Sequence, residues 1–154
     1  MTKRSVVHST FVLERTYDAP PARVFKAFAD PAAKARWFGV SEDELKTGKY
    51  QLDFRVGGRE TWRGGAKEGP EYRNDTVYRD IVPDERIIFV YDMFRDDNRI
   101  SVSLATVEIK PAGSGAKLIF TEQGAFLEGY DNPKMRESGW GTLLEALGKE
   151  LKGA

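Results

Sequence analysis

The sequence contains no cysteine among its 154 residues. This absence excludes disulfides, thiolate nucleophiles and zinc sites that depend on thiolates. A net charge is missing as well, because 24 Lys and Arg residues balance 24 Asp and Glu residues. No overall field therefore draws the chain to nucleic acid or to an anionic membrane. We expect neither of these as a partner.

Long hydrophobic runs are also absent. A membrane-spanning helix needs about eighteen consecutive apolar residues, and no stretch of the sequence supplies them. Residues 1–8 include no apolar run of the kind that forms a signal peptide. We therefore expect a cytoplasmic protein. At this length, a single domain over residues 1–154 would bury about 70% of the surface of the unfolded chain.

Catalytic motifs are scarce. The single histidine, His8, precedes the first expected strand, and no Gly-x-Ser-x-Gly motif accompanies it, so a serine–histidine triad is not indicated. We interpret His8 as a residue of the surface or of a strand edge. No loop has the ligand spacing of a calcium site, and Gly57-Gly58 is not followed by the Gly-Lys-Ser/Thr of a phosphate loop. We predict no metal site and no cofactor.

The strongest helix signal runs from Asn132 to Leu151. Asn132 is a favourable N-cap, and Pro133 suits the first helical position. Apolar residues then recur three and four positions apart, which places them on one stripe: Trp140, Leu143, Leu144, Leu147 and Leu151. Arg136 and Glu137 fall on the same stripe, so the buried face is charged near its start. Gly139, Gly141 and Gly148 each weaken the helix, which we interpret as close approach of another backbone or as room beside Trp140.

Alternating apolar residues predict β structure for most of the remaining chain. A strand at residues 10–17 precedes two short helices, which contain Val24–Phe28 and Lys34–Phe38. Further strands are expected at residues 50–56, 60–62, 72–82, 86–94, 99–110 and 116–123. Tight turns join these strands, so we predict an α+β fold in which a curved antiparallel sheet of about six to seven strands wraps around the long C-terminal helix. Space left between helix and sheet would suit an apolar ligand.

The hairpin at Gly57-Gly58 allows two registers. A two-residue loop would set Phe54 opposite Thr61 and mix the faces, whereas a three-residue loop over residues 57–59 sets Phe54 opposite Trp62. We expect the second register, with Phe54, Trp62 and Trp140 as mutual neighbours.

Several segments together resemble a known family. They are residues 15–21 (RTYDAPP), 24–28 (VFKAF), 30–31 (DP), 36–38 (RWF), 54–59 (FRVGGR), 80–87 (DIVPDERI) and 139–140 (GW). With them, the chain resembles proteins similar to the activator of heat-shock protein 90 ATPase, in the SRPBCC or START-like superfamily. The resemblance implies a helix-grip fold with an internal cavity. The superfamily includes lipid and hormone carriers, polyketide cyclases and aromatases, and cochaperone domains, so the fold leaves the function open.

Our first functional hypothesis is binding of a small, mostly apolar molecule, aromatic or lipid-like. The candidate ligand-binding residues are Trp37, Phe38, Phe54, Trp62, Tyr78, Tyr91, Phe94, Arg136, Glu137, Trp140 and Leu144. Arg59 and Glu60, together with Arg136 and Glu137, would supply polar groups at the mouth. An arginine there would favour a carboxylate or a phenolate.

Two other functions stay open at this point. A cyclase or aromatase would position a poly-ketone and move a proton with Glu60, Glu122, Glu137 or Tyr91, none of which the sequence singles out. A chaperone-associated interaction domain would instead contact a heat-shock ATPase. The ligand, a homodimer and the pathway are left undetermined by the sequence.

Overall fold

The computed structural model describes residues 4–65 and 67–153. A long strand, β1 (Val6–Tyr17), comes first and is followed by the short helices α1 (Pro21–Ala29), α2 (Pro31–Phe38) and α3 (Glu42–Lys46). The strands β2 (Tyr50–Leu52), β3 (Arg59–Gly64), β4 (Tyr72–Val82), β5 (Arg86–Arg95), β6 (Asn98–Ala112) and β7 (Gly115–Leu127) come next. The last element is the long helix α4 (Pro133–Lys152).

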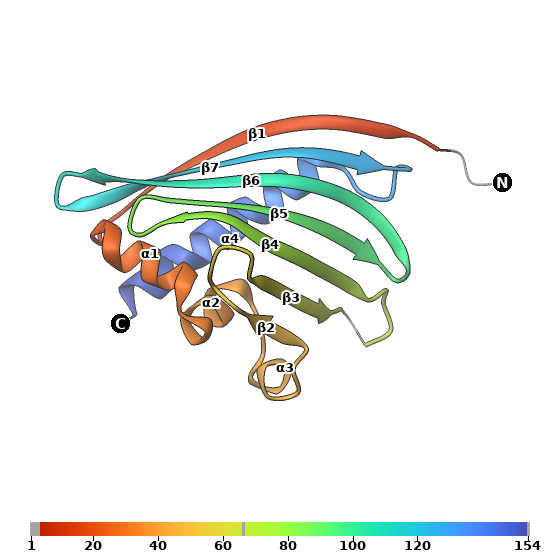
Figure 1. The fold of residues 1–154 in the computed structure, drawn as a ribbon, viewed down its shortest axis with the longest axis horizontal. Helices are drawn as coiled ribbons and strands as arrows, with labels where there is room; N and C mark the ends of the chain where they lie inside the picture. The colour runs from red at the N-terminus through yellow and green to blue at the C-terminus, as the bar shows by residue number, and fades with distance from the viewer. Residues whose placement is uncertain (1–3, 66, 154) are drawn as a thin grey trace.

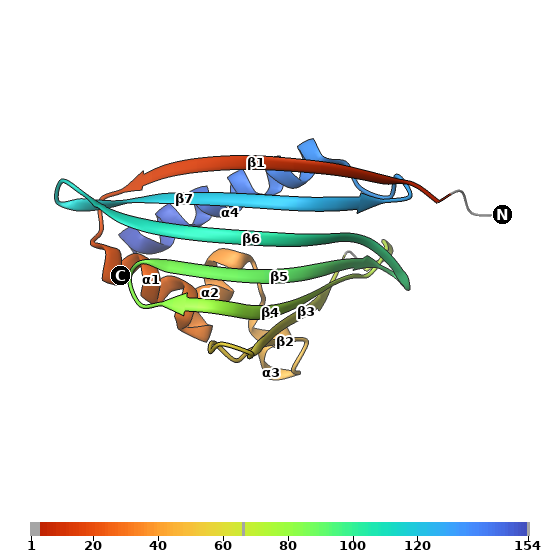
Figure 2. The same cartoon turned by 45° about the horizontal axis from the view of Figure 1, so that its top comes forward.

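Within this part of the chain, seven strands form one antiparallel sheet in the order β1-β7-β6-β5-β4-β3-β2. From β2 to β7 each strand pairs with the next one along the chain. The first strand instead pairs with the last, in a register that runs from Val6 opposite Leu127 to Tyr17 opposite Ala116. Figures 1 and 2 show the long strands curving together along the long axis of the molecule. The antiparallel sheet predicted from the alternation is confirmed.

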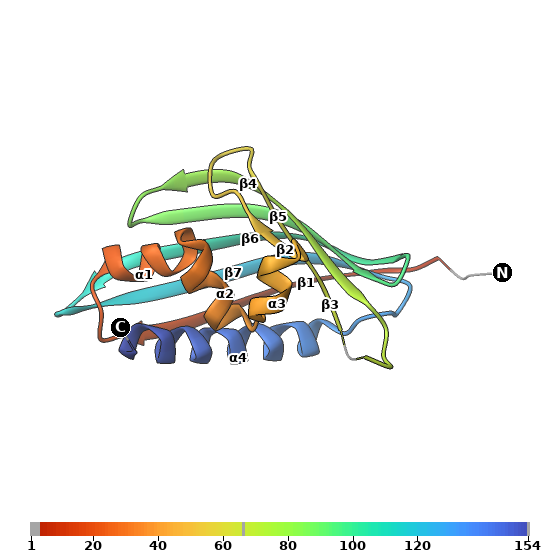
Figure 3. The same cartoon turned by 90° about the horizontal axis from the view of Figure 1, so that it is seen from below.

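The helix α4 runs along one face of this sheet, and the three short helices lie on the same side (Figure 3). Its buried side chains are Trp140, Leu144 and Leu147, three of the apolar residues on the predicted stripe. The ring of Trp140 stacks on Phe120 of β7 with the centroids 4.2 Å apart. The hydroxyl of Tyr17 also donates to the carbonyl of Leu144, at 2.8 Å. The expected helix-grip arrangement is therefore confirmed.

The start of α4 is also as predicted. The side chain of Asn132 accepts a hydrogen bond from the backbone N–H of Lys134, and Pro133 is the first helical residue. This cap fixes where the helix begins, and hence the positions along the sheet at which Arg136 and Trp140 contact it.

The short helices α1 and α2 pack together beneath the sheet. The indole of Trp37 donates to the carbonyl of Ala27 at 2.8 Å and links the two helices. Gly39 ends α2 in the left-handed region, with φ at 81°, where a side chain would be strained. This sharp end leaves Phe38, the last residue of α2, within van der Waals reach of Trp140, with ring centroids 6.0 Å apart.

The prediction of two short helices after the first strand was incomplete, because α3 follows them. Its N-terminus is a capping box in which Ser41 and Glu44 bond each other's backbone N–H groups. This Ser-x-x-Glu spacing was readable in the sequence.

The predicted register of the first hairpin was wrong. The strand β2 ends at Leu52, and Tyr50, not Phe54, lies opposite Trp62. The reason is a longer loop: the N–H of Gly57 bonds the carbonyl of Tyr78 at 2.7 Å and carries the loop onto β4. Phe54 consequently packs against the rings of Tyr78 and Phe25, at 5.0 and 5.6 Å. We had expected Phe54 to be a neighbour of Trp62 and Trp140, and this expectation was wrong.

The last strand is longer than predicted and continues through Gly124 to Leu127. We had interpreted Gly124 as the start of a loop. A Cβ atom built on this glycine would lie only 2.8 Å from the ring of Phe126 and 3.1 Å from the hydroxyl of Ser103. The glycine therefore serves close packing within the sheet.

Candidate functional site

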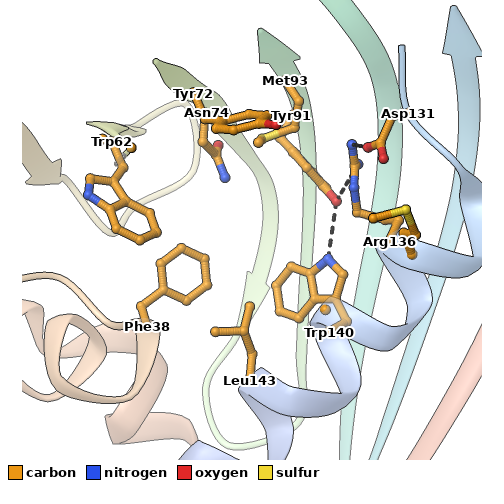
Figure 4. Close-up of a pocket in the computed structure, with 14 residues that line it drawn as sticks. Phe38, Trp62, Tyr72, Asn74, Tyr91, Met93, Asp131, Arg136, Trp140 and Leu143 are labelled. Atoms are coloured by element: carbon orange, nitrogen blue, oxygen red, sulfur yellow. Dashed lines mark hydrogen bonds and ion pairs between the residues drawn. The ribbon is translucent and has the colours of Figure 1, made fainter. Parts of the chain in front are cut away.

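A cavity of about 450 Å³ lies between the N-terminal half of α4 and the strands β3, β4 and β5 (Figure 4). It is lined by Phe38, Trp62, Gly64, Gly65, Tyr72, Asn74, Tyr91, Met93, Asp131, Met135, Arg136, Gly139, Trp140 and Leu143. A volume of this order is typical of small-molecule sites.

Most of the wall is apolar and aromatic. Phe38 stands at its centre, with its ring centroid 5.7 Å from that of Trp62 and 6.0 Å from that of Trp140. Leu143 from the next turn of α4 and Met93 from β5 extend this surface. The helices α2 and α4 and the strands β3 and β5 therefore supply one continuous apolar surface, which suits a ligand with a flat ring system.

One end of the cavity is polar and is organised around the hydroxyl of Tyr91. This hydroxyl donates to Oε1 of Glu122 at 2.6 Å. It accepts from the indole nitrogen of Trp140 at 3.1 Å and from Nη1 of Arg136 at 3.0 Å. Burial, reinforced by Glu122, raises the pKa of Tyr91 above its ordinary value, so the phenol stays protonated.

Arg136 ties this end of α4 to the sheet. Its Nη1 also donates to Glu122 at 3.3 Å, and its Nη2 donates to Ser101 and to Asp131, both at 2.7 Å. Only 10% of the side chain is exposed. Burial opposes the charge of this guanidinium, but Tyr91, Glu122 and Asp131 outweigh burial and raise the pKa of Arg136 above its ordinary value.

Glu122 is fully buried behind Tyr91 and accepts hydrogen bonds on both oxygens. Oε1 accepts from Tyr91, and Oε2 accepts from Ser103 at 3.0 Å as well as from Arg136. Burial raises the pKa of Glu122, whereas the hydrogen bonds from Tyr91 and Ser103 and the charge of Arg136 pull it down. The result is a carboxyl group that holds its proton more tightly than a glutamate in water.

A second buried charge pair lies beside the cavity. Nζ of Lys34 is 2.8 Å from Oε2 of Glu60, and both side chains are almost completely buried. The hydroxyls of Tyr50 and Tyr78 also donate to this carboxylate. The Lys34 ammonium lies 4.4 Å from the ring centroid of Phe38. This cluster therefore supports the cavity wall from behind, although none of its four members lines the cavity.

Five residues from the predicted ligand-binding set line the cavity: Phe38, Trp62, Tyr91, Arg136 and Trp140. Three others, Trp37, Tyr78 and Leu144, are buried in the adjoining core. Phe54 packs against that core on the far side of Tyr78.

The remaining predicted residues lie elsewhere. Phe94 is covered by the guanidinium groups of Arg73 and Arg99, at 4.0 and 5.2 Å from its ring centroid. Glu137 lines a separate shallow groove with Arg15 and Glu145, between β1 and α4.

The expected polar mouth also differs from the prediction. Arg59 is exposed, and Glu60 is buried against Lys34 instead of standing at an opening. His8 is exposed on an edge strand, as predicted, but it lies within β1, which begins at Val6 and not at Thr10.

Sequence reasoning missed several lining residues. Met93 was detectable, because it shares the alternation of Tyr91 on one strand. Asn74 and Asp131 carried no such signal, since a polar residue in a strand or loop is typical of the surface. Their inward position depends on how β4 and the loop before α4 pack, which the local sequence does not encode.

Comparisons with known proteins agree with this architecture. The family model for the Activator of Hsp90 ATPase homolog 1-like protein matches residues 18–152. The crystal structure of the Mll3558 protein from Rhizobium loti is 51% identical, with a TM-score of 0.88, over 95% of this chain and 99% of that chain. A protein from Rhizobium leguminosarum is 41% identical, with a TM-score of 0.92, over 99% and 100% of the two chains.

A more distant structure shares the fold. DynU16, a protein of the dynemicin biosynthetic locus, is 16% identical with a TM-score of 0.67, over 94% of this chain and 47% of that one. No curated protein matches the chain. Among the helices that the structure describes, none is long and apolar enough to cross a bilayer.

Proposed function

Since this chain belongs to the family of Activator of Hsp90 ATPase homolog 1-like proteins, and since its last helix and its sheet enclose an aromatic cavity, we propose that it binds a small, mostly apolar molecule that carries a ring. The observation that carries the proposal is the continuous surface of Phe38, Trp62 and Trp140 around about 450 Å³. Binding is favoured when an apolar ligand displaces water from an apolar cavity of this kind.

Gly139 supports the same proposal. It lies in the middle of α4, where a glycine costs about 1 kcal/mol relative to alanine, and it lines the cavity. A Cβ atom built on it meets nothing within 4 Å. The packing of the protein would therefore tolerate a side chain at this position. A side chain here would, however, occupy the free space beside Trp140, and the glycine leaves that space open to a ligand.

The NMR signals of the indole N–H groups can report ligand binding. Trp62 and Trp140 line the cavity, while Trp37 is 2% exposed in the core and bonds Ala27. In a ¹H–¹⁵N NMR titration with a neutral naphthalene derivative, we expect the indole signals of Trp62 and Trp140 to shift. The signal of Trp37 serves as an internal reference and should move least. A titration in which Trp62 and Trp140 stay still would refute the proposal.

A matched pair of variants localises the binding. Gly139→Leu places a side chain in the cavity and should weaken binding at least tenfold. Gly141→Leu adds the same side chain two residues further along α4, where a Cβ would meet only the flexible end of Arg15 at 3.5 Å, and should bind normally. Equal affinities for the two variants would place the ligand outside the cavity.

A cyclase-type enzyme is a second candidate, and one observation favours it. The Tyr91 hydroxyl lies on the cavity wall and is bonded to Glu122, whose pKa is raised by burial. Such a pair could pass a proton to a bound poly-ketone. Under this alternative, Glu122→Gln would keep ligand binding and abolish turnover of the ligand.

A further inference from the structure

We propose that the ligand is uncharged and carries a hydrogen-bond acceptor, such as a ketone carbonyl, and that Asn74 is the residue that recognises this acceptor. The inference rests on the proposed function and adds the chemical class of the ligand. It follows from an account of which polar atoms at the cavity already have partners.

The two terminal nitrogens of Arg136 are not available to a ligand anion. Its two terminal nitrogens donate to Tyr91, Glu122, Ser101 and Asp131, which matches their four N–H groups. Its charge is also compensated. With both carboxylates ionised the cluster of Arg136, Glu122 and Asp131 is net negative, and with Glu122 protonated it is neutral. A carboxylate or phenolate ligand would therefore meet no uncompensated positive charge here.

The polar groups of Tyr91, Trp140 and Trp62 are also engaged. The Tyr91 hydroxyl donates once and accepts twice, which is its full capacity. The indole of Trp140 is used in that network, and the indole nitrogen of Trp62 donates to Oε2 of Glu44 at 3.1 Å. In this structure the polar groups of these side chains are therefore bonded to other residues of the protein.

Asn74 differs from them. It lies on β4 between Trp62 of β3 and Met93 of β5 in the sheet register, and it lines the cavity. Its Oδ1 accepts a hydrogen bond from the hydroxyl of Thr76 at 2.6 Å, and Thr76 is 1% exposed. This buried hydroxyl holds the amide in one orientation.

The amide nitrogen of Asn74 consequently faces the cavity. Figure 4 shows it directed toward the space bounded by Phe38 and Trp140. Within residues 4–65 and 67–153, Nδ2 finds no hydrogen-bond acceptor of the protein. An amide N–H₂ donates hydrogen bonds, so the partner that completes it is an acceptor oxygen. Because the charge of Arg136 is compensated, a carbonyl, ether or hydroxyl oxygen suits this place better than a carboxylate.

Two probes of nearly the same shape test this inference. 2-Acetylnaphthalene carries a carbonyl, and 2-ethylnaphthalene lacks it. The wild-type protein should bind the ketone about three- to tenfold more tightly, the value of one neutral hydrogen bond. 2-Naphthoate, an anion of similar size, should bind more weakly than the ketone. Tighter binding of the naphthoate would overturn the inference.

Variants of Asn74 assign the preference to this residue. Asn74→Leu should bind both neutral probes equally, and the isosteric Asn74→Asp should prefer the hydrocarbon. Asp75→Asn changes the neighbouring residue, which pairs with Arg73 on the opposite side of the strand, and should keep the wild-type ratio. An unchanged ratio in Asn74→Leu would refute the role of Asn74.

The two proposals fail in distinguishable ways. If neither neutral probe shifts the indole signals of Trp62 and Trp140, the proposed function is wrong. If both probes bind with equal affinity to the wild-type protein, the cavity binds ring compounds but Asn74 does not select among them.

Discussion

The indole nitrogen of Trp140 lies 3.1 Å from the hydroxyl oxygen of Tyr91, so the long helix donates directly to the middle of the sheet. Arg136, one turn earlier, donates to the same oxygen. Helix and sheet are therefore fixed to each other at the polar end of the cavity, and the shape of the cavity depends on that attachment.

Tyr91→Phe should destabilise the protein. The change removes one hydroxyl and leaves Glu122, Arg136 and Trp140 each with one hydrogen bond fewer in a buried setting, at a cost of about 1–3 kcal/mol. Urea denaturation would measure the loss in the free energy of unfolding. Tyr72→Phe is the control, because Tyr72 also lines the cavity but is 42% exposed. Equal losses for the two variants would show that the network contributes nothing.

Lys34→Met should destabilise the protein more than Tyr91→Phe does. It leaves the carboxylate of Glu60 buried without its positive partner, which typically costs about 3–5 kcal/mol. A second change, Glu60→Gln, should restore part of the loss in the double variant. Arg36→Met on the same helix breaks only an ion pair with Glu150 that is open to solvent, and its effect should be clearly smaller. Chemical denaturation of all four proteins checks this order.

The buried carboxyl of Glu122 predicts a specific pH dependence. Because its pKa is raised in the folded protein, the folded state binds the proton more tightly than the unfolded chain does. Its contribution to stability is therefore complete at pH values below its ordinary pKa of 4.5 and is lost as the pH rises through the raised pKa. Wild type should gain stability relative to Glu122→Gln as the pH falls through this window. A difference that is constant, or that grows with pH, would contradict the assignment.

Gly139→Ala and Gly148→Ala should have different effects on stability. At position 139 the new methyl group meets open space, so the better helix propensity of alanine should stabilise the protein by about 0.5–1 kcal/mol. At position 148 the methyl group would lie 3.3 Å from the ring of Tyr17, which its hydrogen bond to Leu144 holds in place. Thermal unfolding should show a higher Tm for the first variant and no such gain for the second.

The global architecture was accessible from the sequence because its signals are local and strong. The stripe that contains Trp140, Leu144 and Leu147 has a helical period, and the strands alternate over ten residues or more. The first hairpin was not accessible in the same way. Alternation continues past Leu52, but the bond from Gly57 to Tyr78 ends the pairing there, and that bond joins residues far apart in the sequence.

The site was accessible only in part, for a similar reason. Large rings indicate buried surface wherever they occur, so Phe38, Trp62 and Trp140 could be named. The packing of α2 against β4 and α4 decides which of these rings line the cavity. Trp37 and Tyr78 are buried in the core instead, and the local sequence does not show this difference. The inward orientation of Asn74 further depends on the hydroxyl of Thr76.

The pairing of β1 with β7 has a consequence for the way the protein is made. Val6 and Leu127 are partners, so the first strand to leave the ribosome has no neighbour until residues 115–127 have been synthesised. At bacterial or eukaryotic elongation rates this delay is on the order of ten seconds. Such distant partners also close slowly, because a large chain entropy is lost before any contact forms. During translation, the backbone N–H and C=O groups of β1 therefore have no partner strand in their own chain, and such groups can pair with other chains.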